Sequence, residues 1–335
     1  MPLHLPKIAR ATLMASMLAF AGLASAATSI TLYNAQHASL TKEWVEQFTR
    51  DTGIAVTIRN GGDVELANQI VQEGAASPAD VFLTENSPAM VLVDNAKLFA
   101  PLDAATLAQV PAEYRPSHGR WVGIAARSTV FVYNKDKLPA ANLPKSLMDL
   151  ASPAWKGRWA ASPSGADFQA IVAAVLEMKG EAATLAWLKS MKENAVVYRG
   201  NGNVLKAVNA GQIESGVIYH YYYVGDQAKT GENSKNAALH YFKHQDPGAF
   251  VSVSGGGVLA SSKQKEAAQS FIKWLTGKQG QQVLQTGDAY EYAVGAAVAS
   301  NAKLVPLKDL DAPKIDPATL NSKKVVELMT QAGLL

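Results

Sequence analysis

The sequence contains no cysteine. Disulfide bonds are therefore excluded, and so is every metal site that depends on a thiolate. Any metal ion that this chain holds must be bound through oxygen and nitrogen atoms. The candidate ligands are thus carboxylates, phenolates and imidazoles.

After its first residues, the sequence has no apolar run long enough to form a membrane helix. The first residues are typical of an export signal, because Lys7 and Arg10 precede an apolar run over residues 11–23, and Ala24-Ser25-Ala26 has the small-x-small pattern of a cleavage site. This run is shorter than the about 20 residues that span a bilayer. We expect residues 1–26 to be a signal peptide and the mature chain to act in the periplasm.

The chain also lacks an excess of charge of either sign. It has 31 basic and 28 acidic residues, and residues 1–26 hold two of the basic ones, so the mature chain has 29 against 28, or +1. No basic cluster interleaved with aromatic residues is visible. The sequence therefore predicts neither nucleic-acid binding nor membrane insertion. About 309 residues remain after cleavage, which suits two domains.

Recognisable catalytic motifs are missing. There is no Gly-x-Ser-x-Gly elbow, no His-Glu-x-x-His helix and no Gly-x-Gly-x-x-Gly after the first predicted strand. The run Gly255-Gly256-Gly257 lacks the Gly-Lys-Ser/Thr ending of a phosphate-binding loop. Since no nucleophile and base can be assigned, we expect a binding protein and not an enzyme.

The mature chain begins with alternating strand and helix patterns. Strands are predicted over residues 28–33, 54–58 and 80–84, with helices over residues 40–48 and 64–72 between them. This order predicts a parallel α/β domain, in which ligands bind beyond the carboxyl ends of the strands. His37 and Glu85 follow the first and third strands, so we expect them on one rim. The alternatives are a solvated loop histidine and a Glu85 that caps the next helix.

Arg127 and residues 164–167 mark two further candidate sites. Residues 121–133 have the pattern of a long strand, where an unpaired charge is costly, so Arg127 must pair or face a cleft. Ser164-Gly165-Ala166 begins a predicted helix, whose free N–H groups and positive dipole end suit an anion. The alternative for Ser164 is a simple N-cap, and Asp167 would repel an anion placed too close. Further helices are predicted over residues 182–192, 264–284 and 321–332.

The most unusual stretch is Tyr219-His220-Tyr221-Tyr222-Tyr223, with four phenols in five residues. Neighbouring side chains diverge in a regular strand or helix. Adjacent tyrosines therefore converge on one target only where the backbone bends, such as where a strand gives way to a helix. A helix N-terminus there would also favour the phenolate form. The alternative is an aromatic cluster that packs a domain face.

Four separated motifs agree with one family. They are Tyr-Asn-Ala-Gln-His at residues 33–37, Ala-Asp-Val-Phe-Leu-Thr-Glu at 79–85, Ser-Gly-Ala at 164–166, and Tyr221-Tyr222. In their order and spacing, the sequence resembles the periplasmic ferric-ion-binding proteins of bacterial iron-uptake ABC transporters. The resemblance covers essentially the whole mature chain, up to Ala332-Gly333-Leu334 near its end.

The resemblance implies a set of site residues. The ligands of Fe³⁺ that it implies are His37, Glu85, Tyr221 and Tyr222. A synergistic anion, phosphate or carbonate, would be bound by Ser164, Gly165, Ala166 and Asn201. Arg127 is a further candidate, because other branches of the family bind carbonate with an arginine. Tyr219 departs from a relative in which an Asn contacts the anion. Hard oxygen donors with one imidazole suit a hard trivalent ion.

The implied architecture is an α/β, bilobal periplasmic-binding-protein fold of type II, with two mixed-sheet lobes joined by crossover strands. We expect one lobe to contain residues 27–126 and 252–300, and the other residues 127–251 and 301–335. Hinge closure would then assemble the metal site from both lobes. The implied partners are an inner-membrane ABC permease and its ATPase, and we expect the protein to be a monomer.

Two other functions stay open on the sequence alone. One is a binding protein for an anion or other small organic solute without iron. Colour separates the two, because phenolate-to-iron charge transfer tints only a protein that holds iron. The other is a metal-dependent periplasmic enzyme, which would need a catalytic water and a base beyond the metal ligands. The sequence offers no such base.

Overall fold

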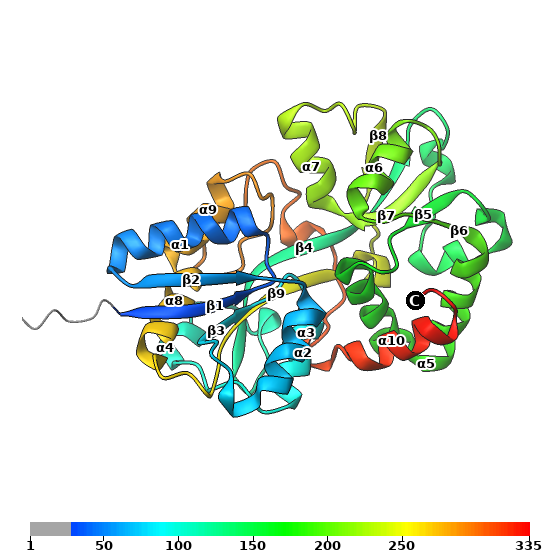
Figure 1. Cartoon of the computed structure of the whole chain (residues 1–335). Helices are drawn as coiled ribbons and strands as arrows, with labels where there is room; N and C mark the ends of the chain where they lie inside the picture. The colour runs from blue at the N-terminus through cyan, green and yellow to red at the C-terminus, as the bar shows by residue number, and fades with distance from the viewer. Residues whose placement is uncertain (1–27) are drawn as a thin grey trace, which may run out of the picture.

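Two α/β lobes lie side by side and share the long strand β4 (Trp121–Asn134), as Figure 1 shows. The structure is a computed structural model and describes residues 28–335. The predicted signal peptide, residues 1–26, lies outside the described residues. The mixed-sheet, bilobal α/β fold expected from the sequence is confirmed.

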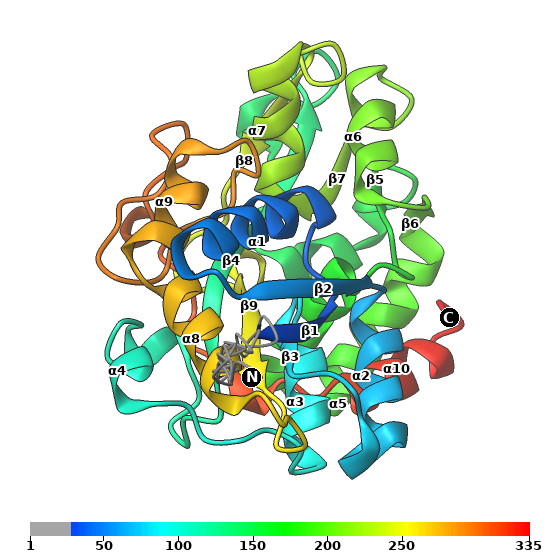
Figure 2. The same ribbon diagram turned by 60° about the vertical axis from the view of Figure 1, so that its left-hand side comes forward.

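The first lobe begins with the predicted β-α-β-α-β order. Strand β1 pairs in parallel with both β2 and β3, which makes its two faces available for helices. Side chains alternate along β1, so that Ile30 and Leu32 pack with α1, α8 and α9, whereas Tyr33 packs with α2 and α3 on the opposite face. Figure 2 shows α1 on one side of this sheet and α2 and α3 on the other. The elements of this lobe are β1 (Ser29–Asn34), α1 (Ala38–Thr52), β2 (Ala55–Asn60), α2 (Asp63–Glu73), β3 (Val81–Leu83), α3 (Ser87–Asn95), α8 (Lys265–Thr276) and α9 (Lys278–Thr286).

Strands β4 and β9 (Val251–Val258) run between the lobes as antiparallel neighbours. The first part of β4, Trp121–Ser128, pairs with β9, which also pairs with β3. The last part, Thr129–Asn134, pairs with β7 (Ser215–Tyr219) and β8 (Ala237–His240). Because β4 takes part in both halves of the sheet, bending of β4 and β9 is a direct route for one lobe to move against the other.

The second lobe surrounds the other half of the sheet. From β4 outward, the strand order is β7, β5 (Trp159–Ala161) and β6 (Ala195–Val197). Phe131 on β4 packs with α5 (Ala166–Asn194) and α10 (Ser322–Gln331). Val130 and Val132 point to the opposite face and pack with α6 (Asn201–Asn209). Helix α7 (His220–Lys229) follows β7 directly.

Two glycines set helix limits that differ from the predicted ones. The prediction of one continuous helix over residues 264–284 is wrong, because Gly277 has extended backbone angles (φ −78°, ψ 177°) that end α8 and begin α9. The helices predicted after residue 166 and over residues 182–192 form one element, α5, which is interrupted at Gly180 (φ 79°, ψ 169°). Glycine takes this positive φ without steric cost.

The three consecutive glycines of β9 are explained by packing. A Cβ atom at Gly255 would lie 2.2 Å from Cγ of Met90, and one at Gly257 would lie 2.7 Å from Cε1 of Phe99. Side chains from α3 and from the segment after it therefore reach the backbone of β9 so closely that only glycine fits.

Helix α4 (Ala104–Leu107) is a single turn between α3 and β4. None of the helices in residues 28–335 combines the length and the apolar character that a bilayer-spanning segment requires.

Candidate metal and anion site

His37 and Glu85 lie together at the carboxyl ends of β1 and β3. The Nε2 atom of His37 is 3.0 Å from Oε1 of Glu85. Parallel pairing of the two strands places both loops on one rim, as the strand order predicts. Glu85 does not cap the following helix, because Asn86 occupies the N-cap position of α3. The side chains of His37 and Glu85 remain 28% and 23% exposed, so neither is fully buried.

The tyrosines lie where β7 ends and α7 begins, as predicted. Tyr219 is the last residue of β7, and Tyr221 and Tyr222 belong to the first turn of α7. The rings of Tyr221 and Tyr222 stack with their centroids 4.3 Å apart. The ring of His37 meets that of Tyr221 edge-on at 5.0 Å. The structure thus brings side chains from the rims of both lobes to one place, with the lobes closed around them.

The carboxylate of Asp167 lies at the centre of this cluster. It is buried in the first turn of α5, beside the Ser164-Gly165-Ala166 motif. Its Oδ2 atom accepts hydrogen bonds from the hydroxyls of Tyr221 (3.2 Å) and Tyr222 (3.3 Å). Its Oδ1 atom accepts one from Nδ2 of Asn86, in the first lobe, at 3.1 Å. Asp167 therefore presents its carboxyl oxygens to the same point as the tyrosines, and burial, followed by the charge of Glu85, raises its pKa.

Of the predicted anion-binding residues, some contact Asp167 and others point away from it. Asn201 begins α6 and donates from Nδ2 to Oδ2 of Asp167 at 2.9 Å. The N–H of Gly165 donates to the carbonyl of Ser162 at 3.1 Å and is not directed at the cluster. Ser164 is exposed and does not cap α5, whose N-cap is Gly165 and has no side-chain cap. The N-cap alternative for Ser164 is wrong, while Asn201 is the predicted anion ligand with a demonstrated contact in the cluster.

Arg127 is fully buried and pairs with a carboxylate that the sequence did not reveal. Its Nη2 atom donates to Oε2 of Glu291 at 2.6 Å and to Oε1 of Gln36 at 3.0 Å, and its Nη1 atom donates to the backbone carbonyl of Glu85 at 2.5 Å. The guanidinium also lies 5.5 Å from the ring centroid of Tyr221. Of the two predicted outcomes for Arg127, pairing is the one observed.

Glu291 also contacts His37. Its Oε1 atom lies 3.0 Å from Nδ1 of His37, on the ring edge opposite Nε2. A carboxylate at one ring nitrogen fixes the orientation of an imidazole and leaves the other nitrogen to face a metal. His37 is thus held between Glu291 behind it and Glu85 in front of it.

Hydrogen bonds and charges among His37, Glu85, Glu291 and Arg127 shift the pKa of His37 and the pKa of Glu291. Burial by itself would lower the pKa of His37, but hydrogen bonds to Glu291 and Glu85 outweigh it and raise the pKa to about 10. Burial would raise the pKa of Glu291, but the charge of Arg127 and the contact with His37 hold it at about 2. His37 is therefore protonated at neutral pH in the absence of a metal, and it must lose a proton to become a ligand.

The phenols are neutral when no metal is present. Burial, and next the charge of Asp167, raise the pKa of Tyr221 and the pKa of Tyr222 above the usual value of 10.0. In the metal-free protein, any preference of the N-terminus of α7 for the phenolate form is outweighed by this burial. Only a strongly charged ion at this place would overcome the desolvation of two buried phenolates.

Within each lobe, the candidate ligand atoms lie about as far apart as neighbouring ligands on a small octahedral cation. Adjacent ligand atoms on such an ion, with bonds of about 2.0–2.1 Å, lie about 2.9 Å apart. The His37–Glu85 distance of 3.0 Å and the distances of 3.2 and 3.3 Å from Asp167 to the two tyrosines are close to that value. In the part of the chain that the structure describes, no group of three or more His, Cys, Asp or Glu side chains could hold a metal by itself. A metal here would need the tyrosines.

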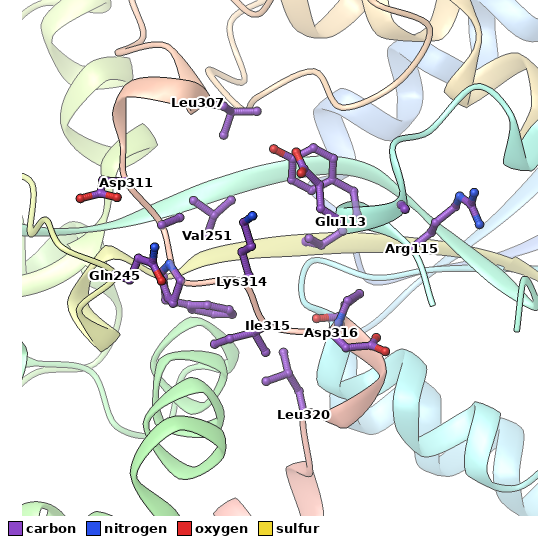
Figure 3. A pocket seen from close by; sticks show the side chains of 18 of the residues that line it. Glu113, Arg115, Gln245, Val251, Leu307, Asp311, Lys314, Ile315, Asp316 and Leu320 are labelled. Carbon is purple, nitrogen blue, oxygen red and sulfur yellow. The ribbon is translucent and has the colours of Figure 1, made fainter. Parts of the chain in front are cut away.

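A large cavity lies on the other side of β9 from this cluster. Ser252 and Ser254 of β9 point toward the cluster, and Ser254 donates to the carbonyl of Glu85 at 2.9 Å. Val251 and Val253 alternate with them and line a cavity of about 760 Å³, whose other walls include Tyr114 and Ile315. Figure 3 shows Val251 and Ile315 in this cavity, with charged side chains such as Glu113 and Lys314 around them. The cavity is thus separate from the cluster.

Sequence reasoning did not assign Asp167, Glu291 or Asn86 to the site. For Asp167 a signal was present, since it directly follows the Ser164-Gly165-Ala166 motif. For Glu291 the only signal was the need of Arg127 for a partner, and the two residues are 164 positions apart. Asn86 follows Glu85 directly, but nothing in the pattern indicates that its amide contacts the opposite lobe.

The chain is similar to a family of solute-binding proteins and to two proteins that are named for binding ferric iron. The family model described as bacterial extracellular solute-binding protein matches residues 76–317. The chain is 73% identical over 338 residues to the Fe(3+)-binding periplasmic protein of Serratia marcescens, and the match covers 100% of both chains. It is 37% identical over 312 residues to the major ferric iron-binding protein of Neisseria meningitidis, with 92% of this chain and 94% of that protein covered.

Solved structures of the same shape exist. The crystal structure of iron-bound HitA from Pseudomonas aeruginosa superposes with a TM-score of 0.86 at 40% sequence identity. The match covers 92% of this chain and 100% of that chain.

Proposed function

Because the chain belongs to the bacterial extracellular solute-binding protein family, we propose that it captures ferric iron between its two lobes and delivers it to an ABC permease. The family resemblance seen in the sequence motifs is confirmed. One observation carries the proposal: His37 and Glu85 from one lobe and Tyr221 and Tyr222 from the other meet at a single point. The names of the relatives from Serratia and Neisseria support the same cargo.

In this proposal each ligand has a separate role. Tyr221 and Tyr222 lose their protons and bind Fe³⁺ as phenolates, which suit a hard trivalent ion. The Nε2 atom of His37 and the carboxylate of Glu85 bind from the opposite lobe, so that iron holds the lobes closed. Glu291 supports His37 from behind and accepts the hydrogen that remains on Nδ1.

We further propose that Asp167 contributes a carboxylate oxygen and that a small anion, phosphate or carbonate, completes the coordination. The anion would lie near Ser164, Gly165, Ala166 and Asn201. The anion would compete with Asp167 for the amide of Asn201, whose Nδ2 atom donates a hydrogen bond to Asp167 at 2.9 Å. Two phenolates and the carboxylates of Glu85 and Asp167 already supply four negative charges to a trivalent ion. A multiply charged anion is therefore disfavoured, and the dependence of iron binding on it should be weak.

In this proposal Arg127 positions the ligands and does not bind the iron itself. Its donors are directed at Glu291, Gln36 and the carbonyl of Glu85, so it orients the first-lobe ligands. A direct role in anion binding would require it to release one of these partners. Its charge, 5.5 Å from the centroid of Tyr221, still favours the phenolate form of that residue.

The remaining parts of the proposal concern transport. Residues 1–26 direct export, the mature monomer acts in the periplasm, and the closed, iron-loaded form is received by an inner-membrane permease with its ATPase. We propose the lobe boundaries expected from the sequence, with the chain leaving the first lobe near Arg127 and returning near Val251. A solute-binding function agrees with the family description.

The visible spectrum tests the iron site. The wild-type protein loaded with Fe³⁺ should show a phenolate-to-iron charge-transfer band, and Tyr221→Phe and Tyr222→Phe should each lose most of it. Tyr223→Phe is the matched control, because the Tyr223 hydroxyl donates to the carbonyl of Ala237 at 3.4 Å, outside the cluster. If both cluster variants keep the full band, the tyrosines are not ligands and the proposal fails.

A further inference from the structure

Asn86 connects three parts of the molecule through one buried amide. It follows β3 in the first lobe and is only 2% exposed. Its Nδ2 atom donates to Asp167 at 3.1 Å, and its Oδ1 atom accepts from the hydroxyls of Tyr219 (3.2 Å) and Ser252 (2.7 Å). Asp167 and Tyr219 belong to the second lobe, and Ser252 belongs to the connecting strand β9.

The backbone that carries Asn86 is held rigidly. Both oxygens of the buried Asp63 carboxylate accept backbone N–H groups, one from Glu85 at 2.9 Å and one from Asn86 at 3.0 Å. The adjacent residues Glu85 and Asn86 are therefore fixed as one unit on the first lobe. A displacement of Asn86 displaces Glu85 with it, so contacts of Asn86 with the second lobe also determine where Glu85 lies.

Two of the hydrogen bonds of Asn86 exist only while the lobes are closed, because they join residues on opposite sides of the cleft. When the lobes separate, Asp167 and Tyr219 move away with the second lobe. A hydrogen bond contributes about 1 kcal/mol net, which corresponds to about fivefold in the ratio of closed to open molecules. Neither Asn86 nor Tyr219 is among the proposed iron ligands, so the Asn86–Tyr219 bond contributes separately from the metal, whereas the Asn86–Asp167 bond involves a proposed ligand.

We infer that Asn86 and Tyr219 form a closure latch: a pair of positioning residues that holds the lobes closed and slows iron release without contacting the iron. The inference deepens the proposed function and rests on it for the identity of the cargo. It gives Tyr219 a role distinct from that of Tyr221 and Tyr222, although the three phenols are nearly adjacent in the sequence. Asp63 and Ser252 keep the first-lobe half of the latch in place.

Tyr219→Phe is the sharpest variant, since it removes one hydroxyl and keeps the buried ring. The Oδ1 atom of Asn86 retains the hydrogen bond from Ser252, so no buried acceptor is left unpaired. Asn86→Ala removes both bonds across the cleft, and Tyr223→Phe again serves as the control. The measurement is the loss of the visible band after iron-loaded protein is mixed with excess citrate.

We expect Tyr219→Phe to release iron about fivefold faster than the wild type and Asn86→Ala faster still. For Tyr219→Phe the initial band per bound iron should be unchanged, because the Tyr219 hydroxyl donates to Asn86 and to none of the proposed iron ligands. The double variant should release iron at the rate of Asn86→Ala alone, because Tyr219 has no partner left once Asn86 is gone. Equal rates for Tyr219→Phe and the wild type would overturn the latch.

Small-angle X-ray scattering of the iron-free proteins separates this inference from the proposed function. Tyr219→Phe should have a larger radius of gyration than the wild type and than Tyr223→Phe, since its lobes open more often. If the wild type binds no iron, the proposed ferric function is refuted. The comparison of radii of gyration would then still show whether Asn86 and Tyr219 hold the lobes closed. Identical radii for all three proteins would refute the latch independently of any iron.

Discussion

Glu291→Gln should be among the most damaging single substitutions in this protein. Arg127 and Glu291 are both 0% exposed, and Glu291 receives hydrogen bonds from Arg127 at 2.6 Å and from Gln36 at 3.2 Å. Its other oxygen faces His37 at 3.0 Å. A glutamine at this place loses the charge and turns an amide NH₂ toward one of these donors. The guanidinium of Arg127 then keeps no close carboxylate, since Oε2 of Glu85 is 4.0 Å away.

Two routes give the same magnitude for this loss. A pKa of Glu291 held at about 2, against its usual 4.5, corresponds to about 3 kcal/mol of folding free energy. Breaking a buried ion pair by removing one partner costs about 3–5 kcal/mol in general. We therefore expect Glu291→Gln to lower the free energy of unfolding by about 3 kcal/mol. In urea this corresponds to a midpoint lower by about 1 M.

The assay is urea unfolding of the iron-free protein at several pH values. Because the pKa of Glu291 is lower in the folded chain than in the unfolded chain, its contribution is complete above pH 4.5 and is lost as the pH falls to about 2. The difference between wild type and variant should therefore be full at pH 7 and shrink toward pH 3. Glu46→Gln is the control, since its pair with Lys42 is exposed and should contribute less than about 1 kcal/mol. A difference below 1 kcal/mol at pH 7, or one that is constant down to pH 3, would refute the reasoning.

The remaining predictions concern the iron site. His37→Ala and Glu85→Ala should keep much of the visible band but retain iron less well against citrate, because the second lobe alone then holds it; unchanged retention in both variants would exclude a first-lobe contribution. Asp167→Asn should make iron retention depend on added phosphate or carbonate, since the amide no longer supplies a negative charge next to Asn201. Loading the anion-stripped proteins with and without each anion checks this, and equal anion dependence of Asp167→Asn and wild type would contradict a ligand role for Asp167.

The lower stability of Glu291→Gln and the weaker retention of His37→Ala are connected through one contact. Glu291 orients His37, so Glu291→Gln should also weaken iron retention although Glu291 is not a proposed ligand. The substitutions are within one network, and their effects on retention should not add.

Much of the first lobe and of the tyrosine motif can be predicted from the sequence pattern. The β-α-β-α-β order places His37 and Glu85 on one rim, because parallel strands present their carboxyl ends at the same edge of a sheet. The clustering of tyrosines likewise predicts a backbone bend, which is present where β7 passes into α7. These predictions succeed because they depend on local periodicity and on rules of strand connection.

The pairing of charges in the site could not be predicted from the sequence. Because Arg127 was expected to be buried, it needed a partner of opposite charge. No sequence pattern near Arg127 identifies Glu291, which lies 164 residues later. Asp167 was expected to repel an anion near the start of α5. Packing within the second lobe instead places its carboxylate among the hydroxyls of Tyr221 and Tyr222 and the amide of Asn201, and the first lobe adds the amide of Asn86. Pairings of this kind depend on how segments far apart in the sequence, and the two lobes, pack against each other. Local patterns of residue types do not indicate which of these segments come into contact.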